Sequence, residues 1–163
     1  MKKLLCILLL LTLALPALAE EQDPFAPYVL TAPEGAALTE HEGTYTLVSG
    51  MTRVVVIPIA RVPDENPAEA VIRLMAQFEP EAVIGEDLPL VEGFTGLTAL
   101  NEGKFGEGVD QITVMLLSDA GDLLILSGYD LTGDEAAVQS LLDALLSALT
   151  VNGAPVLQPA PLS

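Results

Sequence analysis

The chain has 163 residues, with 23 acidic side chains against 6 lysines and arginines, and this length predicts a single domain. The formal net charge of −17 argues against nucleic acid as a partner, because a phosphate-binding surface needs clustered Lys and Arg. A hydrophobic content of 51% excludes a disordered acidic chain, which would bury too little apolar surface. One histidine and one cysteine leave almost no material for a zinc site.

The N-terminus has the three parts of a secretory signal peptide. These are the positive charges of Lys2-Lys3, the apolar run Leu4–Leu15 and the small-residue pattern Ala17-Leu18-Ala19. The apolar run is shorter than the about 20 residues that a membrane-spanning helix needs. We therefore expect residues 1–19 to be a cleaved signal peptide. The protein would be secreted or extracytoplasmic, in the bacterial cell envelope, with no membrane span after cleavage.

The expected mature chain divides into three parts. Residues 20–27 are polar and interrupted by proline, and we interpret them as an N-terminal strap. Residues 28–151 form the single globular domain. Residues 152–163 are rich in proline and lack periodicity, which predicts an extended tail. The only cysteine, Cys6, lies in the signal peptide, so no disulfide is expected to stabilise the domain.

The first half of the domain predicts three strands and one helix. Runs of strand-forming residues bounded by turn residues predict strands over Tyr28–Ala32, Thr44–Ser49 and Arg53–Arg61. The helix is expected to begin after Asn66, which can cap its first turn, and to end before Pro80. Its apolar residues recur at helical spacing and predict the buried face: Val71, Ile72, Met75 and Phe78.

The second half predicts three more strands and a terminal helix. The strands span Phe94–Leu100, Gln111–Leu117 and Asp122–Gly128, and a hairpin turn joins the last two. Thr132 and Glu135 match a capping box, in which the threonine caps the helix and the glutamate reaches back. One apolar stripe of this helix should face the core: Val138, Leu141, Leu142, Leu145, Leu146 and Leu149.

These elements predict an α+β fold. The segments Val54–Ile59 and Leu123–Leu126 are apolar at successive positions, whereas a sheet with one solvated side would show alternation. We therefore expect an antiparallel sheet of about six strands covered by two helices. This is an α/β/α sandwich in the order β-β-β-α-β-β-β-α.

The order of elements resembles that of the PsbP-like fold. Pro33-Glu34-Gly35 follows the opening strand, and a capped helix follows the last strand. The same fold is seen in the DcrB-like bacterial envelope proteins and in a nuclear transport factor that binds the Ran GTPase. The resemblance covers about residues 28–150 and implies a binding or accessory protein. It brings no catalytic or ligand motif, and Ala36 stands where the family has an aromatic residue.

No residues match a catalytic, cofactor or metal motif. His41 is the only candidate for the base of a triad, and it lies in a polar acidic stretch with no nucleophile fixed near it. The segment Gly103–Gly108 has Phe105 where a phosphate loop needs serine or threonine after its lysine. The acidic residues lack the calcium-loop pattern. They predict a solvated surface with weak, nonspecific binding of divalent cations at most.

The same glycine-rich segment offers a candidate for a partner contact. Lys104 is one of few cations, and it stands beside Phe105 between two predicted strands. Aromatic and cationic side chains on loops are common anchors of binding. The alternative is that Phe105 packs under the sheet edge while Lys104 only solubilises the loop.

The sequence therefore predicts a non-catalytic accessory or binding protein of the cell envelope. It would need no cofactor, and its partner would be an unknown protein or envelope component. Two alternatives stay open. One is a carboxylate-dependent hydrolase acting on cell-wall polymers. The other is a purely structural domain that dimerises through a sheet edge or through its leucine stripe.

Overall fold

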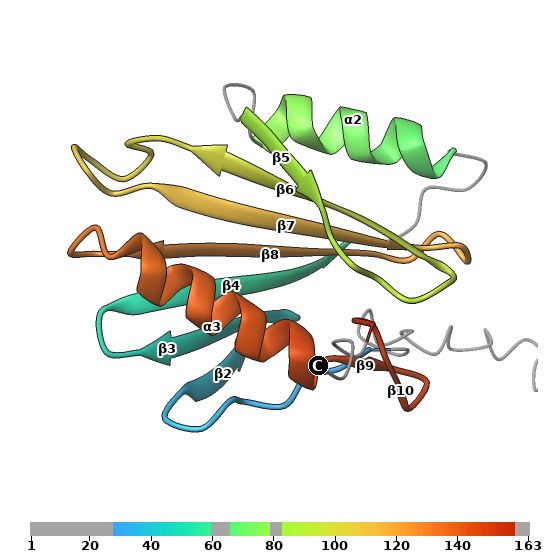
Figure 1. Ribbon diagram of the computed structural model, residues 1–163, viewed down its shortest axis with the longest axis horizontal. Helices are drawn as coiled ribbons and strands as arrows, with labels where there is room; N and C mark the ends of the chain where they lie inside the picture. Colours follow the sequence, from blue (N-terminus) through green and yellow to red (C-terminus); the bar gives the residue numbers. More distant parts are fainter. Residues whose placement is uncertain (1–27, 60–65, 79–82, 159–163) are drawn as a thin grey trace, which may run out of the picture.

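The computed structural model describes residues 28–59, 66–78 and 83–158 (Figure 1). The predicted signal peptide and strap lie outside the described residues, as does the end of the predicted tail, residues 159–163. The architecture is α+β, as predicted, and consists of antiparallel sheet with two helices.

The main sheet has seven strands in the order β2-β3-β4-β8-β7-β6-β5. Their bounds are β2 (Ala37–His41), β3 (Thr44–Ser49), β4 (Thr52–Ile59), β5 (Val83–Asp87), β6 (Phe94–Asn101), β7 (Gln111–Ser118) and β8 (Leu123–Asp130). A smaller sheet has the order β1-β9-β10 and contains β1 (Tyr28–Val29), β9 (Thr150–Val151) and β10 (Ala154–Pro155). The helices are α2 (Pro67–Phe78) and α3 (Glu135–Ala148).

The predicted strand order is incomplete, because it lacks both edge strands of the main sheet. Strand β2 is polar and largely exposed, and β5 contains a glycine and two acids. An edge strand pairs on one side only, so it needs little of the apolar pattern that marks a central strand. The opening strand also differs from prediction. It is only Tyr28–Val29, and it pairs with β9 in the smaller sheet instead of joining the main one.

Burial on both faces is confirmed for Leu123–Leu126 of β8, and β7 beside it is buried on both faces as well. The other segment predicted to be buried on both faces, Val54–Ile59 of β4, is only half-buried at alternate positions. Alternate residues of β7 and β8 belong to two different hydrophobic clusters. One cluster contains Val114, Leu116, Leu124 and Leu126 together with the leucine stripe of α3. The other contains Met115, Leu117, Leu123 and Ile125 together with Leu74 of α2. Figure 1 shows α3 running across β8, β4 and β3.

Helix α3 buries the predicted stripe, but a different residue caps it. Leu142 and Leu145 are fully buried. The Oδ1 atom of Asp134 accepts a hydrogen bond from the backbone N–H of Ala137 at 3.0 Å and makes Asp134 the N-cap. Thr132, the predicted cap, instead donates its hydroxyl to the carboxylate of Asp130. The capping-box prediction is wrong because Asp130 offers Thr132 a charged acceptor two residues away.

Helix α2 occupies its predicted span, but one residue of its predicted buried face, Ile72, points outward. Leu74 is buried, and Val71 packs beside it against the sheet. Ile72, predicted to face the core, is 69% exposed. The helical spacing of the apolar residues predicted a buried face wide enough to include Ile72. The contact between the helix and the sheet is narrower, so Ile72 stays exposed. The side chains of Met75 and Phe78 lie outside the described residues.

The predicted extended tail is wrong as far as residue 158. Strand β10 returns antiparallel to β9, and Val156 then enters the main core with no exposed surface. Leu157 forms a β-bridge with Leu90, and the side chain of Gln158 donates from Nε2 to the carbonyl oxygen of Leu90 at 2.7 Å. Proline-rich sequence without periodicity is therefore compatible with packed structure at a sheet edge.

Candidate functional site

The face of the main sheet that carries α2 is graded from apolar to polar, because the strand register aligns side chains in rows. Three rows cross β4, β8 and β7 on this face. In order from the polar end they are Arg53, Tyr129 and Gln111; then Val55, Ser127 and Thr113; then Ile57, Ile125 and Met115. The third row belongs to the hydrophobic cluster beneath α2.

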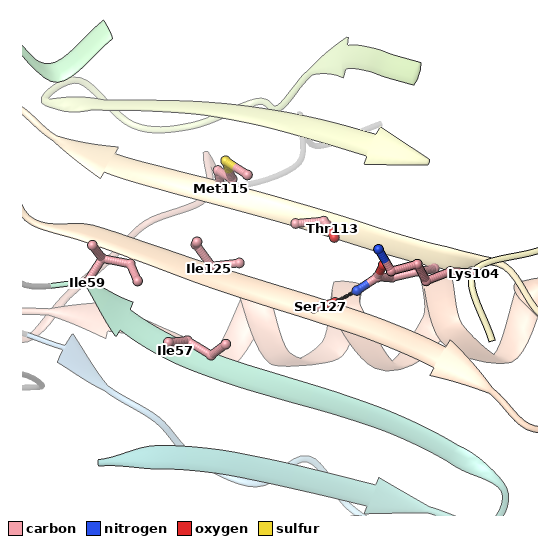
Figure 2. Close-up of a pocket in the computed structure, with 8 residues that line it drawn as sticks. Ile57, Ile59, Lys104, Thr113, Met115, Ile125 and Ser127 are labelled. Atoms are coloured by element: carbon pink, nitrogen blue, oxygen red, sulfur yellow. Dashed lines mark hydrogen bonds between the residues drawn. The ribbon is translucent and has the colours of Figure 1, made fainter. Parts of the chain in front are cut away.

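A cavity of about 240 Å³ opens on this face. The described residues that line it are Ile57, Ile59, Lys104, Gln111, Thr113, Met115, Ile125 and Ser127. Figure 2 shows the isoleucines and the methionine gathered at one end, with Thr113, Ser127 and Lys104 at the other. A mostly apolar wall with a few convergent polar groups is the usual character of small-molecule sites in proteins.

Gln111 lines the polar end of this cavity and carries its most unusual atom. The residue is 7% exposed, and its Nε2 donates to the hydroxyl oxygen of Ser127, the dashed line in Figure 2. Within the part of the chain that the structure describes, no group donates a hydrogen bond to its Oε1. A buried polar atom left in this state costs about 1–3 kcal/mol in proteins. Gln111, which lines the cavity, therefore carries a buried acceptor that no described group satisfies.

The loop between β6 and β7 brings Lys104 to the cavity. The carboxylate of Asp110 accepts a hydrogen bond from the backbone N–H of Gly103 at 2.7 Å and closes the base of the loop. Inside it, the N–H of Phe105 donates to the carbonyl oxygen of Val109 at 3.3 Å. The loop is therefore held by its own hydrogen bonds, and its lysine lines the cavity at the end where Gln111 lies.

Phe105 stands next to the cavity rather than in its lining. Its ring is tilted against that of Tyr129, with 4.3 Å between the ring centroids, and half of the residue is exposed. This half exposure does not fit a ring packed under the sheet edge. The contact role predicted for Lys104 and Phe105 stays a prediction.

In the described part of the chain, two groups have clearly shifted pKa values, and both lie outside the cavity. Asp130 accepts hydrogen bonds from the hydroxyl and N–H of Thr132 and from the hydroxyl of Thr52, and these lower its pKa to about 2. Burial, with a smaller effect of Asp122, raises the pKa of Tyr28. Asp130 is thus held as a carboxylate that fixes the turn between β8 and α3, and it is poorly suited to donate a proton near neutral pH.

The remaining candidates do not converge on a site. His41 is an exposed residue at the end of β2. Among the described residues, no three histidine, cysteine or acidic side chains gather as a metal site would require. Neither helix in the described ranges is long and apolar enough to span a bilayer.

A second cavity of about 180 Å³ lies on the opposite face, beside α3. Its lining includes Glu135 and Gln139 of α3 and apolar residues of β6 and β7. The one buried side-chain polar atom without a hydrogen-bond partner in the described part of the chain belongs to Gln111 and not to this lining. The first cavity is therefore the stronger candidate.

The sequence singled out Lys104 as a partner contact and not as part of a cavity, and it gave no prediction for Gln111 and Ser127. Both missed residues sit in strands predicted correctly from their apolar runs. A weak signal was present in the alternation of the strands. Gln111 and Ser127 are polar residues on the same sheet face as the apolar residues Met115 and Ile125 of their own strands. Only the register of β7 against β8 shows that they meet, with Gln111 opposite Tyr129 and Ser127 opposite Thr113.

Comparison of the chain with models of known protein families and with curated proteins finds no match.

Proposed function

We propose that this chain is a non-catalytic binding domain of the bacterial cell envelope that holds a small, mainly apolar molecule in the cavity between β4, β8 and β7. The observation that carries the proposal is the buried amide of Gln111. Its Oε1 lacks a hydrogen-bond donor in the described part of the chain, and Gln111 lines a cavity that is otherwise mostly apolar. A binding site gains affinity when its ligand satisfies such an atom.

The chemistry of the lining favours binding over catalysis. The polar groups that line the cavity are one amine, one amide and two hydroxyls, from Lys104, Gln111, Thr113 and Ser127. Among the residues that the structure describes, the lining contains no carboxylate and no histidine, the groups that most often serve as general acid or base. A cell-wall hydrolase of the paired-carboxylate type would need two acids in one cleft.

The location and the finer fold are part of the same proposal. The N-terminal pattern of residues 1–19 supports export. The two hydrophobic clusters, one with α3 and one with Leu74 of α2, support the layering of an α/β/α sandwich. This layering is what a PsbP-like protein would have, and such a protein would act as an accessory or binding component.

Binding of a simple apolar probe tests this function. We expect 1-octanol to bind the purified protein with one site in isothermal titration calorimetry and to raise its melting temperature. Ser127→Leu places a larger side chain in the cavity, and it should abolish this binding. Thr39→Leu, on the exposed strand β2 outside the lining, is the matched control and should bind as the wild type does.

Circular dichroism and thermal melting establish that both variants fold before binding is compared. If 1-octanol shows no saturable binding to the wild type, the proposal is wrong. Equal binding by Ser127→Leu and the wild type would mean that 1-octanol binds elsewhere on the protein, outside this cavity. Recovery of a chemically altered probe would show that the protein is an enzyme and would contradict the proposed non-catalytic role.

A further inference from the structure

The cavity on the α2 side has two chemically distinct ends, and each constrains a ligand differently. Ile57, Ile59 and Ile125 form the apolar end with Met115, and the side chains of these described residues offer no hydrogen bond to a polar group. A polar head placed there would lose its hydration without compensation. An elongated ligand must therefore direct its hydrocarbon part toward Ile59.

The polar end contains a hydrogen-bond acceptor without a donor. One of the two N–H groups of the Gln111 amide is used by Ser127, whereas the Oε1 of Gln111 has no donor in the described part of the chain. A ligand that carries only acceptors, such as an ether or an ester, would leave that oxygen unsatisfied and would bury it more deeply. A ligand with a hydroxyl or amide N–H would satisfy it.

The burial of this end limits the charge of the head group. Gln111 is 7% exposed, and Thr113 beside it is 1% exposed. Moving a charged group into such surroundings costs far more than moving a neutral donor, unless an opposite charge pairs with it. The one charge that a described residue brings to this end is the positive charge of Lys104, which opposes a cationic head. It favours an anionic head, but a carboxylate has no hydrogen to donate to the Oε1 of Gln111.

From these observations we infer that the ligand is an amphipathic molecule with an aliphatic body and an uncharged hydroxyl or amide head. The head donates to the Oε1 of Gln111, and the body lies along Ile57 and Ile125 toward Ile59. This inference rests on the function proposed above, since it names the ligand class of the same cavity.

Two probes with the same hydrocarbon body separate this inference from the function on which it rests. 1-Octanol can donate a hydrogen bond, whereas 1-methoxyoctane can only accept one. We expect the wild type to bind 1-octanol roughly tenfold more tightly, the usual consequence of leaving one buried acceptor unsatisfied. The comparison within the wild type needs no variant, so it holds even if a substitution at Gln111 fails to fold.

Two variants then test which side chains cause the preference for 1-octanol and which contact the hydrocarbon chain. Gln111→Met keeps the length of the side chain but removes the amide, so the preference for 1-octanol should disappear. Ile59→Ala shortens the apolar end and should weaken both probes by the same factor, because their hydrocarbon bodies are identical. Isothermal titration calorimetry measures all combinations.

The outcomes are distinguishable. If both probes bind the wild type equally well, the inference is overturned while the proposed function stands; this result would mean that the amide presents its N–H to the cavity or that water serves the oxygen. A preference that persists in Gln111→Met also overturns it. If neither probe binds, the proposed function itself fails.

Discussion

At the scale of single residues, the most strongly constrained charge is Asp130. It lies at the end of β8 and is 4% exposed. It accepts hydrogen bonds from the neighbouring strand β4 and from the turn that follows β8. The hydroxyl of Thr52 reaches it from β4 at 2.8 Å, and the N–H of Thr132 reaches it from the following turn at 2.7 Å. One carboxylate thus joins the end of a strand, its neighbour in the sheet and the start of α3.

We predict that Asp130→Asn lowers the melting temperature at pH 7 by several degrees. The folded pKa of Asp130 is about 2, below its usual value of 3.8, so its charged form stabilises the fold. That stabilisation is complete above the unfolded pKa and is lost as the pH falls through the folded one. The difference in melting temperature between wild type and variant should therefore narrow as the pH falls from about 5 to about 2.

Asp119→Asn is the control for this experiment. Asp119 is exposed in the hairpin between β7 and β8, so its substitution should leave the melting temperature unchanged at every pH. A difference between wild type and Asp130→Asn that stays constant from pH 7 to pH 2 would contradict the assigned role of the charge.

At the scale of elements, the sequence predicted what burial alone determines. Strand Thr44–Ser49, the central strands β7 and β8 and the buried stripe of α3 follow from local apolar patterns. The edge strands β2 and β5 do not, because pairing on one side leaves them free to be polar. The cavity could not be predicted either, since Gln111 and Ser127 are separated along the chain and meet only through the register of the sheet.

The packing of α3 on β8 depends on one glycine. A Cβ atom on Gly128 would come within 2.7 Å of Val138 Cγ1 in the helix and 3.3 Å of Val54 Cγ2 in β4. All three residues lie in the core, where side chains have little room to move. Gly128 therefore sets how closely the helix approaches the sheet.

We predict that Gly128→Ala lowers the free energy of unfolding by about 1–3 kcal/mol, the usual cost of overpacking a core. Val138→Ala removes the methyl groups that the new Cβ would meet. The double variant should therefore lose less stability than the sum of the two single variants, and a double-mutant cycle in urea measures this difference. Additive losses would show that the helix adjusts to the added methyl group without contacting it.

At the scale of the whole molecule, the two ends of the described domain meet beside the core. Strand β1 begins it and pairs with β9, which follows α3 directly. Beyond β10 the chain bridges back to Leu90 in the connection between β5 and β6. Tyr28 from the first strand and Val156 from the last segment both belong to the cluster that packs against α3. Residues from the two ends of the described domain therefore complete the same hydrophobic cluster.

This shared cluster makes Val156 a test of whether the last segment belongs to the domain. The residue has no exposed surface, and burial of a valine side chain contributes roughly 1.5–3 kcal/mol. We predict that Val156→Ala lowers the free energy of unfolding by about that amount in urea denaturation, with a single transition. Val29→Ala removes the same methyl groups from a position that is 56% exposed in β1, and it should cost much less.

The slope of the unfolding free energy against urea concentration distinguishes two ways in which Val156 could contribute to stability. If the last segment packs as part of one cooperative unit, the denaturant dependence of unfolding stays the same in Val156→Ala and only the midpoint shifts. If the segment instead detached on its own before the sheet unfolded, the variant would show a smaller slope or a second, earlier transition. A midpoint equal to that of the wild type would mean that residues 152–158 behave as the extended tail predicted from the sequence.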